Sequence, residues 1–142
     1  MFWGIQIMQD NIFFFLKSKK QTKYLYNNIS LSEGLTLMRT HGFTAIPVIN
    51  ADGEYLGTIT EGDFLYYILD HSSEDQEIVS ETEVSKLIRK DFMPAVSFNV
   101  SMEEVLKQSL RQNFIPVVDD RNIFIGIVTR KAVISYLMDL EQ

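Results

Sequence analysis

The sequence contains no cysteine, two histidines and three prolines. The absence of cysteine excludes disulfides, thiolate catalysis and cysteine-based zinc sites. His41 and His71 have no adjacent nucleophile, and the grouping of His71 with Glu74 and Asp75 is too weak to indicate a metal site. Because acid–base or nucleophilic catalysis needs an activated group with a positioned partner, we expect neither an enzyme nor a metal centre.

Positive charge and long apolar runs are also scarce. The chain has 13 Lys and Arg against 19 Asp and Glu, for a net charge of −6. That balance argues against binding to DNA or to an anionic membrane. No run approaches the roughly 20 apolar residues of a membrane span. The apolar residues 1–8 lack the basic region of a signal peptide, so we expect a soluble, cytoplasmic protein.

What the sequence does contain is an internal repeat. Residues 46–49 (Ile-Pro-Val-Ile) and 55–60 (Tyr-Leu-Gly-Thr-Ile-Thr) return at 115–118 and 124–129, at a spacing of 69. Upstream, Ser30, Glu33, Leu35 and Phe43 return at a spacing of 71 as Ser101, Glu104, Leu106 and Phe114. A repeat determines the architecture before any single motif does. Each copy has only about 60 residues, so we expect the two copies to pack together in order to bury enough apolar surface.

The pattern predicts the same elements in each copy: a strand, a helix, two strands joined by a turn, and a second helix. In the first copy we expect strands at 24–26, 45–49 and 54–60, and a helix that starts at Ser30 or Ser32 and ends near Gly42. In the second copy we expect a short helix at 84–90, an N-cap at Ser101 and a turn at 121–122. The second helices should bury the residues 64, 65, 68 and 69 and the residues 133, 134, 137 and 138.

Two copies of an Ile-Pro-Val and Gly-x-x-Thr unit resemble the tandem cystathionine-β-synthase (CBS) domain pair, also called a Bateman module. The resemblance covers residues 12–138 and implies an α+β fold of two β-α-β-β-α repeats packed with pseudo-two-fold symmetry. We accordingly divide the chain into a first repeat at 12–70, an acidic linker at 71–83 and a second repeat at 84–142. The run 12–16 is either core or a subunit contact.

The stretch from Gly57 to Asp63 is the leading candidate site. Thr60 and Asp63 stand where a strand gives way to a helix, and so place a hydroxyl and a carboxylate beside unpaired helix N–H groups. This combination can hold a sugar and its phosphate. The same two residues could equally form a plain N-cap without a ligand.

The two copies differ at this site. Asp63 becomes Ala132 at the spacing of 69, while Glu61 and Gly62 become Arg130 and Lys131. The carboxylate that would accept ribose hydroxyls is thus present only in the first copy. We expect one nucleoside site, on Thr60 and Asp63, with Arg130 and Lys131 available for phosphates near the second cleft.

Further candidates follow from the strands and from the resemblance. Tyr24 and Tyr26 could stack on a base, or could be ordinary half-buried strand residues. Pro47 and Pro116 have no backbone N–H, so one side of each strand donates no hydrogen bond there. That side could either line a pocket or guard an edge strand against pairing. The resemblance places a base pocket around the Ile-Pro pairs, and the candidate ligand residues there are Ala45, Ile46, Pro47, Thr58, Ile115, Pro116 and Thr129.

The resemblance implies a regulatory module that senses adenine nucleotides and changes conformation or partner binding when a ligand binds. AMP, ADP, ATP and cyclic di-AMP are compatible with it, and S-adenosylmethionine less so. No cofactor is required, a homodimer is implied, and any output requires a protein target of unknown identity. The alternative is a scaffold that binds no ligand and uses its apolar N-terminus and acidic linker to bind another protein.

Overall fold

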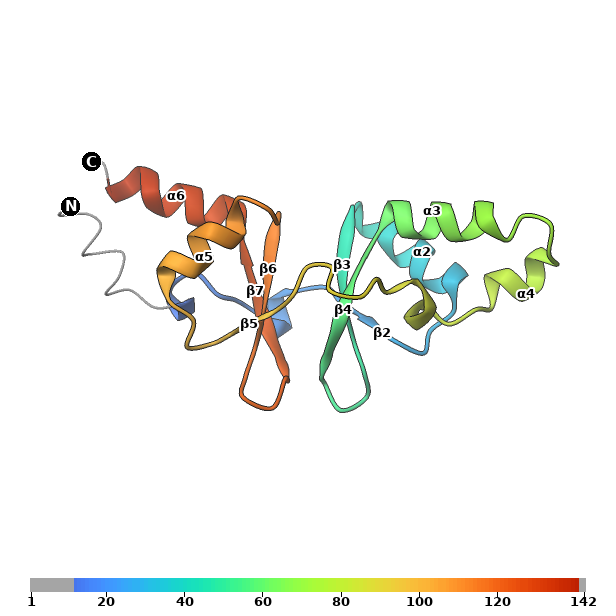
Figure 1. Cartoon of the computed structure of the whole chain (residues 1–142), viewed down its shortest axis with the longest axis horizontal. Coiled ribbons are helices and arrows are strands. Elements are labelled where there is room, and N and C mark those ends of the chain that lie inside the picture. The colour runs from blue at the N-terminus through green and yellow to red at the C-terminus, as the bar shows by residue number, and fades with distance from the viewer. Residues whose placement is uncertain (1–11, 141–142) are drawn as a thin grey trace. The chain divides into compact units, whose positions relative to one another are not determined.

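The computed structural model describes residues 12–140, and the stretch 1–8 discussed above lies outside them. The chain forms two compact units. Lys23–Phe92 make the first, here called the central unit. The described residues through Thr22 and from Met93 onward make the second, here called the terminal unit. Each unit combines a small sheet with helices, which confirms the α+β prediction (Figure 1).

The central unit contains the elements predicted for the first repeat. They are β2 (Leu25–Tyr26), α2 (Leu31–His41), β3 (Ala45–Ile49), β4 (Tyr55–Thr60) and α3 (Glu61–Asp70). The sheet order is β2-β3-β4, with β2 parallel and β4 antiparallel to the middle strand. Both helices lie on the same side of this sheet (Figure 1).

The terminal unit repeats this plan. It contains β5 (Val96–Ser97), α5 (Met102–Ser109), β6 (Phe114–Val118), β7 (Phe124–Thr129) and α6 (Arg130–Leu140). Leu25 pairs with Val48 in one unit, and Val96 pairs with Val117 in the other. These two pairs reproduce the spacings of 71 and 69 found in the sequence, so the strand register confirms the repeat.

The predicted helix and turn signals are confirmed. The Ser30 side chain accepts a hydrogen bond from the Glu33 N–H, and Ser101 accepts one from Glu104. Gly42 ends α2 in the left-handed conformation, with φ at 69°. The two hairpin turns are also alike, because Asn50 Oδ1 and Asp119 Oδ1 each accept two backbone N–H groups of their own turn.

Each unit has its own apolar core, but the second helix of each repeat buries fewer residues than predicted. Phe64 in α3 and Val133 in α6 are buried. Leu65 and Leu69 are 53% and 56% exposed, and Ile134 and Met138 are 48% and 62% exposed. The prediction that these four residues face inward is wrong, because the small sheet below each helix covers only one narrow stripe of it.

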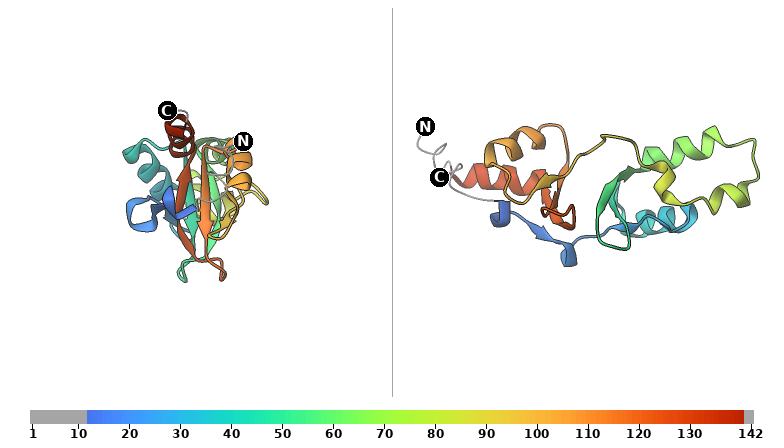
Figure 2. Two further views of the ribbon diagram at one scale, coloured as in Figure 1. Left: turned by 90° about the vertical axis from the view of Figure 1, so that its left-hand side faces the viewer. Right: turned by 60° about the horizontal axis from the view of Figure 1, so that its bottom comes forward.

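The N-terminal segment packs differently from the prediction. It forms two short 3-10 helices, η1 (Ile12–Phe14) and η2 (Lys19–Gln21), on either side of β1 (Lys17–Ser18). β1 pairs antiparallel with β7, so the sheet order is β1-β7-β6-β5. Ile12 is fully buried in the terminal unit's core. The segment that we assigned to the first repeat therefore completes the second, as Figure 2 shows in blue.

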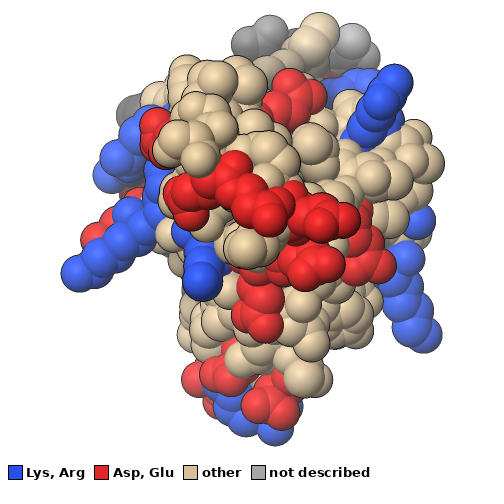
Figure 3. Space-filling view, turned by 90° about the vertical axis from the view of Figure 1, so that its right-hand side faces the viewer, with Lys and Arg blue, Asp and Glu red and all other residues tan. Residues whose placement is uncertain are grey.

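The segment that follows α3 is also more structured than a solvated linker. It contains α4 (Gln76–Ser80) and the 3-10 helix η3 (Val84–Leu87), which is shorter than the helix predicted at 84–90. Val79, Val84 and Leu87 are buried, and the Leu31 N–H donates to Thr82 O at 2.7 Å. The acidic side chains of this segment are exposed, as predicted for a solvated linker, and form a band on the face viewed in Figure 3.

Two glycines allow these segments to approach the hairpins. A Cβ on Gly57 in β4 would meet Ile88 Cγ2 at 2.5 Å, and a Cβ on Gly126 in β7 would meet the backbone oxygen of Lys17. The φ angles are 152° and 154°, which few residues other than glycine adopt. Segments 12–18 and 84–89 therefore occupy matching places in the terminal and central units. None of the described helices has the length and apolarity that a membrane crossing needs.

We expect Gly126→Ala to lower the free energy of unfolding by about 3 kcal/mol, because it adds backbone strain and a clash with Lys17. Gly42→Ala is the matched control. Its φ is 69° but nothing lies within 4 Å of the added Cβ, so it should cost only about 1 to 2 kcal/mol. Urea unfolding measures both, and equal losses would contradict the close packing of β1.

Candidate functional site

The strand register brings most of the predicted site residues of the central unit to one sheet face. Ala45 lies opposite Thr60, and Pro47 lies opposite Thr58. Side chains alternate along a strand, and Ile46, Val48 and Ile59 point into the core under the helices. The other face therefore carries Ala45, Pro47, Thr58 and Thr60. Tyr24 and Tyr26 flank the core residue Leu25, so the alternation places them on this face too.

The isoleucines of the two Ile-Pro pairs do not share this face. Ile46 is 2% exposed and Ile115 is 1% exposed, each inside the core of its own unit. Their side chains are therefore core residues, and only their backbone could contact a ligand. β3 and β6 are internal rather than edge strands. Pro47 is tolerated because β2 is short and pairs only with Val48 and Ile49.

The two tyrosines next to Leu25 contact each other. The rings of Tyr24 and Tyr26 lie edge to face, with centroids 5.8 Å apart. Burial, followed by the charge of Tyr26 and a hydrogen bond to it, raises the pKa of Tyr24. Tyr26 is 45% exposed, so one ring of the pair remains accessible to a planar ligand.

Thr60 and Asp63 form a reciprocal cap at the start of α3. Thr60 Oγ1 accepts a hydrogen bond from the Asp63 N–H at 3.3 Å, and Asp63 Oδ2 accepts one from the Thr60 N–H at 2.8 Å. The Thr60 hydroxyl also donates to Asp63 Oδ2 at 3.0 Å. These bonds give the two residues the N-cap role that the sequence allowed. They also hold the Asp63 carboxylate in one orientation at the positive end of the helix.

Arg89 is a further member of this site that the sequence analysis missed. Its Nε lies 2.8 Å from Asp63 Oδ1, and one of its Nη atoms lies 3.5 Å from Asp63 Oδ2. The guanidinium also lies over the ring of Phe92, 3.6 Å from the centroid. Asp63 and Arg89 are 26 residues apart. No local pattern connects them, because their contact depends on where the segment after η3 is placed.

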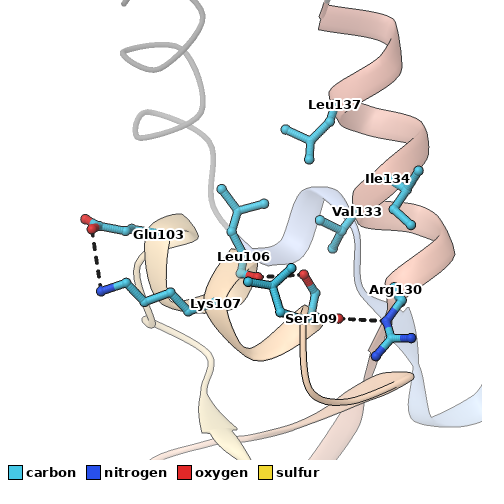
Figure 4. Close-up of a pocket in the computed structure, with 9 residues that line it drawn as sticks. Glu103, Leu106, Lys107, Ser109, Arg130, Val133, Ile134 and Leu137 are labelled. Carbon is cyan, nitrogen blue, oxygen red and sulfur yellow. Dashed lines mark hydrogen bonds and ion pairs between the residues drawn. The ribbon is translucent and has the colours of Figure 1, made fainter.

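The corresponding position of the terminal unit has a different chemistry. Thr129 Oγ1 accepts a hydrogen bond from the Ala132 N–H at 3.1 Å. Ala132 has no carboxylate that could accept a second bond from Thr129, as Asp63 does from Thr60. Arg130 Nε donates to Ser109 O at 2.7 Å (Figure 4), which ties this side chain to the end of α5. Lys131 is exposed. The cap is therefore present in both copies, whereas the carboxylate site is present in one.

Arg130 also borders an open groove of about 560 Å³ between α5 and α6. Its apolar lining residues include Leu106, Val133, Ile134 and Leu137 (Figure 4). An ion pair between Glu103 and Lys107, at 3.7 Å, lies along one edge. The groove is apolar and lies on the helical side, whereas the predicted ligand residues Pro116 and Thr129 belong to the opposite face of the sheet.

Thr58 is a buried member of the candidate face. It is 1% exposed, and its hydroxyl lies 2.7 Å from the Tyr55 hydroxyl. Burial raises the pKa of Tyr55 to about 12, and the hydrogen bond to Thr58 opposes this only in part. The Thr58 hydroxyl is thus engaged within the unit.

The raised pKa makes stability depend on alkaline pH. Protonated Tyr55 stabilises the fold fully below pH 10.0, and this contribution is lost as the pH rises through about 12. Tyr55→Phe should lower the free energy of unfolding at pH 7 by about 1 kcal/mol, because Thr58 loses its partner. It should also flatten the decline above pH 10.0. Urea unfolding at several pH values tests this prediction, with the exposed Tyr66→Phe as control. If the stability of Tyr55→Phe declined with pH in parallel with that of the wild type, the prediction would be wrong.

Solved structures of other proteins match this fold over nearly the whole chain. CbpB in complex with c-di-AMP has a TM-score of 0.88 at 19% identity and covers 97% of this chain and 90% of its own. A CBS domain protein from Streptococcus pneumoniae TIGR4 has a TM-score of 0.82 at 29% identity, covering 91% and 87%. CBSX2 in complex with AMP has a TM-score of 0.76 at 19% identity, covering 93% and 98%.

Sequence comparison agrees with the structural match. An uncharacterised protein of Methanocaldococcus jannaschii is 24% identical, covering 84% of this chain and 88% of its own length. One from Methanopyrus kandleri is 27% identical over 69% of this chain, which spans about half (48%) of that protein. The family model for the CBS domain matches twice, at residues 6–70 and 79–139. The chain therefore belongs to the CBS domain family, of which it carries two copies in tandem.

Proposed function

We propose that this chain is a regulatory module that binds an adenosine nucleotide through Thr60 and Asp63. Binding changes the conformation of the module or its contact with another protein. The observation that carries the proposal is the fixed carboxylate of Asp63 at the N-terminus of α3, beside a sheet face that carries small and aromatic side chains.

The chemistry of this face suits a nucleoside. A carboxylate can accept hydrogen bonds from ribose hydroxyls, and Ala45 leaves room beside Thr60, its partner across the strands. Tyr26 presents a partly exposed ring for the base. AMP and c-di-AMP, the ligands in the solved structures of two relatives, both contain adenosine, which supports this ligand class. AMP, ADP, ATP and cyclic di-AMP are therefore the candidates to test.

The alternative functions make different predictions. A scaffold without a ligand would show no stabilisation by any adenine nucleotide. An enzyme would convert a bound nucleotide on prolonged incubation. Among the described residues, no cluster of three acidic or histidine side chains could hold a metal ion.

Asp63→Ala should weaken nucleotide binding by about 10- to 100-fold, because a hydrogen bond to a charged group contributes roughly 1.5 to 3 kcal/mol. Thermal unfolding against AMP, ADP, ATP, cyclic di-AMP and S-adenosylmethionine measures this. A ligand at about 100 times its dissociation constant should add roughly 2.7 kcal/mol to the stability of the wild type.

Glu61→Ala is the matched control for this experiment. It removes another carboxylate from the first turn of α3, but this residue is exposed and lies outside the Thr60–Asp63 cap. Its nucleotide affinity should stay within about twofold of the wild type. Equal loss in both variants would assign the effect to the helix dipole and remove Asp63 from the site.

We also infer that two chains pair through the second helices of the repeats. Leu65 and Leu69 in α3 correspond to Ile134 and Met138 in α6 at the repeat spacing of 69, and all four are exposed. An apolar side chain that is exposed at matching positions of both copies is consistent with a contact surface. Leu110, which is 82% exposed, adds to the apolar surface around the α5–α6 groove.

The double variant Leu65→Glu/Ile134→Glu should shift the protein from two chains to one in sedimentation equilibrium, because it places charge in an apolar contact. Ile78→Glu is the control. Ile78 is 67% exposed on α4, so this change removes a comparable apolar side chain elsewhere. A wild type that sediments as a single chain would refute the pairing.

A further inference from the structure

The carboxylate of Asp63 is already almost saturated with hydrogen-bond donors. Its Oδ2 accepts from the Thr60 N–H at 2.8 Å and from the Thr60 hydroxyl at 3.0 Å, while Arg89 Nε lies 2.8 Å from Oδ1. A carboxylate offers about four lone-pair positions. At most one strong position therefore remains, on Oδ1, and two neighbouring ribose hydroxyls need two.

The Thr60 bonds and the Arg89 bond differ in how easily they can be exchanged. Thr60 is the N-cap of α3, so breaking its bonds would expose the end of a helix. The Arg89 side chain is 51% exposed, whereas Asp63 is 10% exposed. Water can solvate a displaced guanidinium at little cost. Arg89 is thus the donor that a ribose can replace.

The internal repeat shows that Asp63 and Arg89 change together. Ala132 stands in place of Asp63 at the spacing of 69, and Ser18 stands in place of Arg89 at the spacing of 71. Ser18 and Arg89 follow the residues Lys17 and Ile88, which approach the equivalent glycines Gly126 and Gly57. The copy without the carboxylate is therefore also the copy without the arginine. A capping role alone does not explain this, because Thr129 caps α6 without either residue.

Arg89 also lies in the segment that leaves the central unit. Its guanidinium lies over the Phe92 ring, and the Phe92 N–H donates to Arg89 O at 3.4 Å. The terminal unit resumes at Met93. The Asp63–Arg89 contact therefore fixes the last residues of the central unit to the start of α3.

We propose that Arg89 competes with ribose for the carboxylate of Asp63, so that nucleotide binding releases Arg89 and the segment that ends at Phe92. This inference rests on the proposed nucleotide site and adds its regulation. Arg89 lowers the affinity of the free module for the ligand, and the ligand's binding energy is coupled to a segment that connects the two units.

Adenosine is the probe, because it carries the ribose hydroxyls without a phosphate that could itself attract Arg89. Arg89→Met keeps an unbranched side chain of similar length near Phe92 and removes the donors. Its affinity for adenosine, measured by titration calorimetry, should rise roughly two- to fivefold, the range expected for an exposed ion pair. Arg89→Lys keeps the charge but loses the paired Nε and Nη donors, and should lie between Arg89→Met and the wild type.

Salt provides a second measurement. Raising sodium chloride from about 0.05 to about 0.5 M should tighten adenosine binding to the wild type, because salt weakens the competing ion pair. The affinity of Arg89→Met should change much less. Arg121→Met is the matched control, because it removes another exposed arginine that pairs with an aspartate, Asp119, in a hairpin turn of the terminal unit. Its affinity should equal that of the wild type.

The outcomes separate this inference from the proposed function. If adenosine binding is lost in Asp63→Ala but is unchanged or weaker in both Arg89 variants, the competition is refuted and the nucleotide site stands. If no adenine nucleotide stabilises the wild type, or if Asp63→Ala binds adenosine as tightly as the wild type does, both proposals fail. Tighter binding in Arg89→Met together with a normal Arg121→Met supports the competition.

Discussion

The close approach of one chain segment to each hairpin is the constraint on which both units depend. A sheet of three short strands cannot by itself cover the core of a repeat. Each unit therefore adds a segment from another part of the chain, next to a glycine in its last strand: Ile88 approaches Gly57, and Lys17 approaches Gly126. Ile12 and Val84, which lie in these segments, are fully buried. The absence of a Cβ at two positions thus allows both cores to close.

This arrangement also determines the chemistry of the candidate site. The segment that covers Gly57 carries Arg89 to the carboxylate of Asp63. The segment that covers Gly126 has Ser18 at the position that corresponds to Arg89, and the terminal unit has Ala132 at the position that corresponds to Asp63. The start of α3 therefore carries a cation-paired carboxylate, whereas the start of α6 carries Arg130 and Lys131 and has no carboxylate, on strands with equivalent pairing.

Asp63 combines a structural and a binding role in the proposed function. Its reciprocal bonds with Thr60 stabilise the start of α3 and orient the carboxylate before any ligand arrives. A preoriented acceptor lowers the entropy that binding must overcome. In the proposed competition the half-exposed Arg89 opposes this advantage, because its guanidinium would have to leave before ribose could bind both oxygens. The affinity of the site would then be set by the balance of the two effects.

Much of the fold could be predicted from the sequence, since its signals are local. Repeated Ile-Pro-Val and Gly-x-x-Thr units, serine caps and the glycine at position 42 identified the strands, the helix starts and the end of α2. The register then placed Ala45, Pro47, Thr58 and Thr60 on one face, where alternation had to bring them. The same alternation places the side chains of Ile46 and Ile115 in the cores of the two units.

Only the tertiary structure showed which segment completes which unit. Lys17 and Ser18 pair with a strand more than 100 positions later in the chain, and Arg89 contacts an aspartate 26 positions earlier. Such contacts depend on which strand edge remains open once both hairpins have formed, and no local propensity encodes that. The sequence by itself thus determined the elements common to the two repeats, the repeat and the carboxylate. The packing of distant segments alone decided that an arginine would accompany that carboxylate.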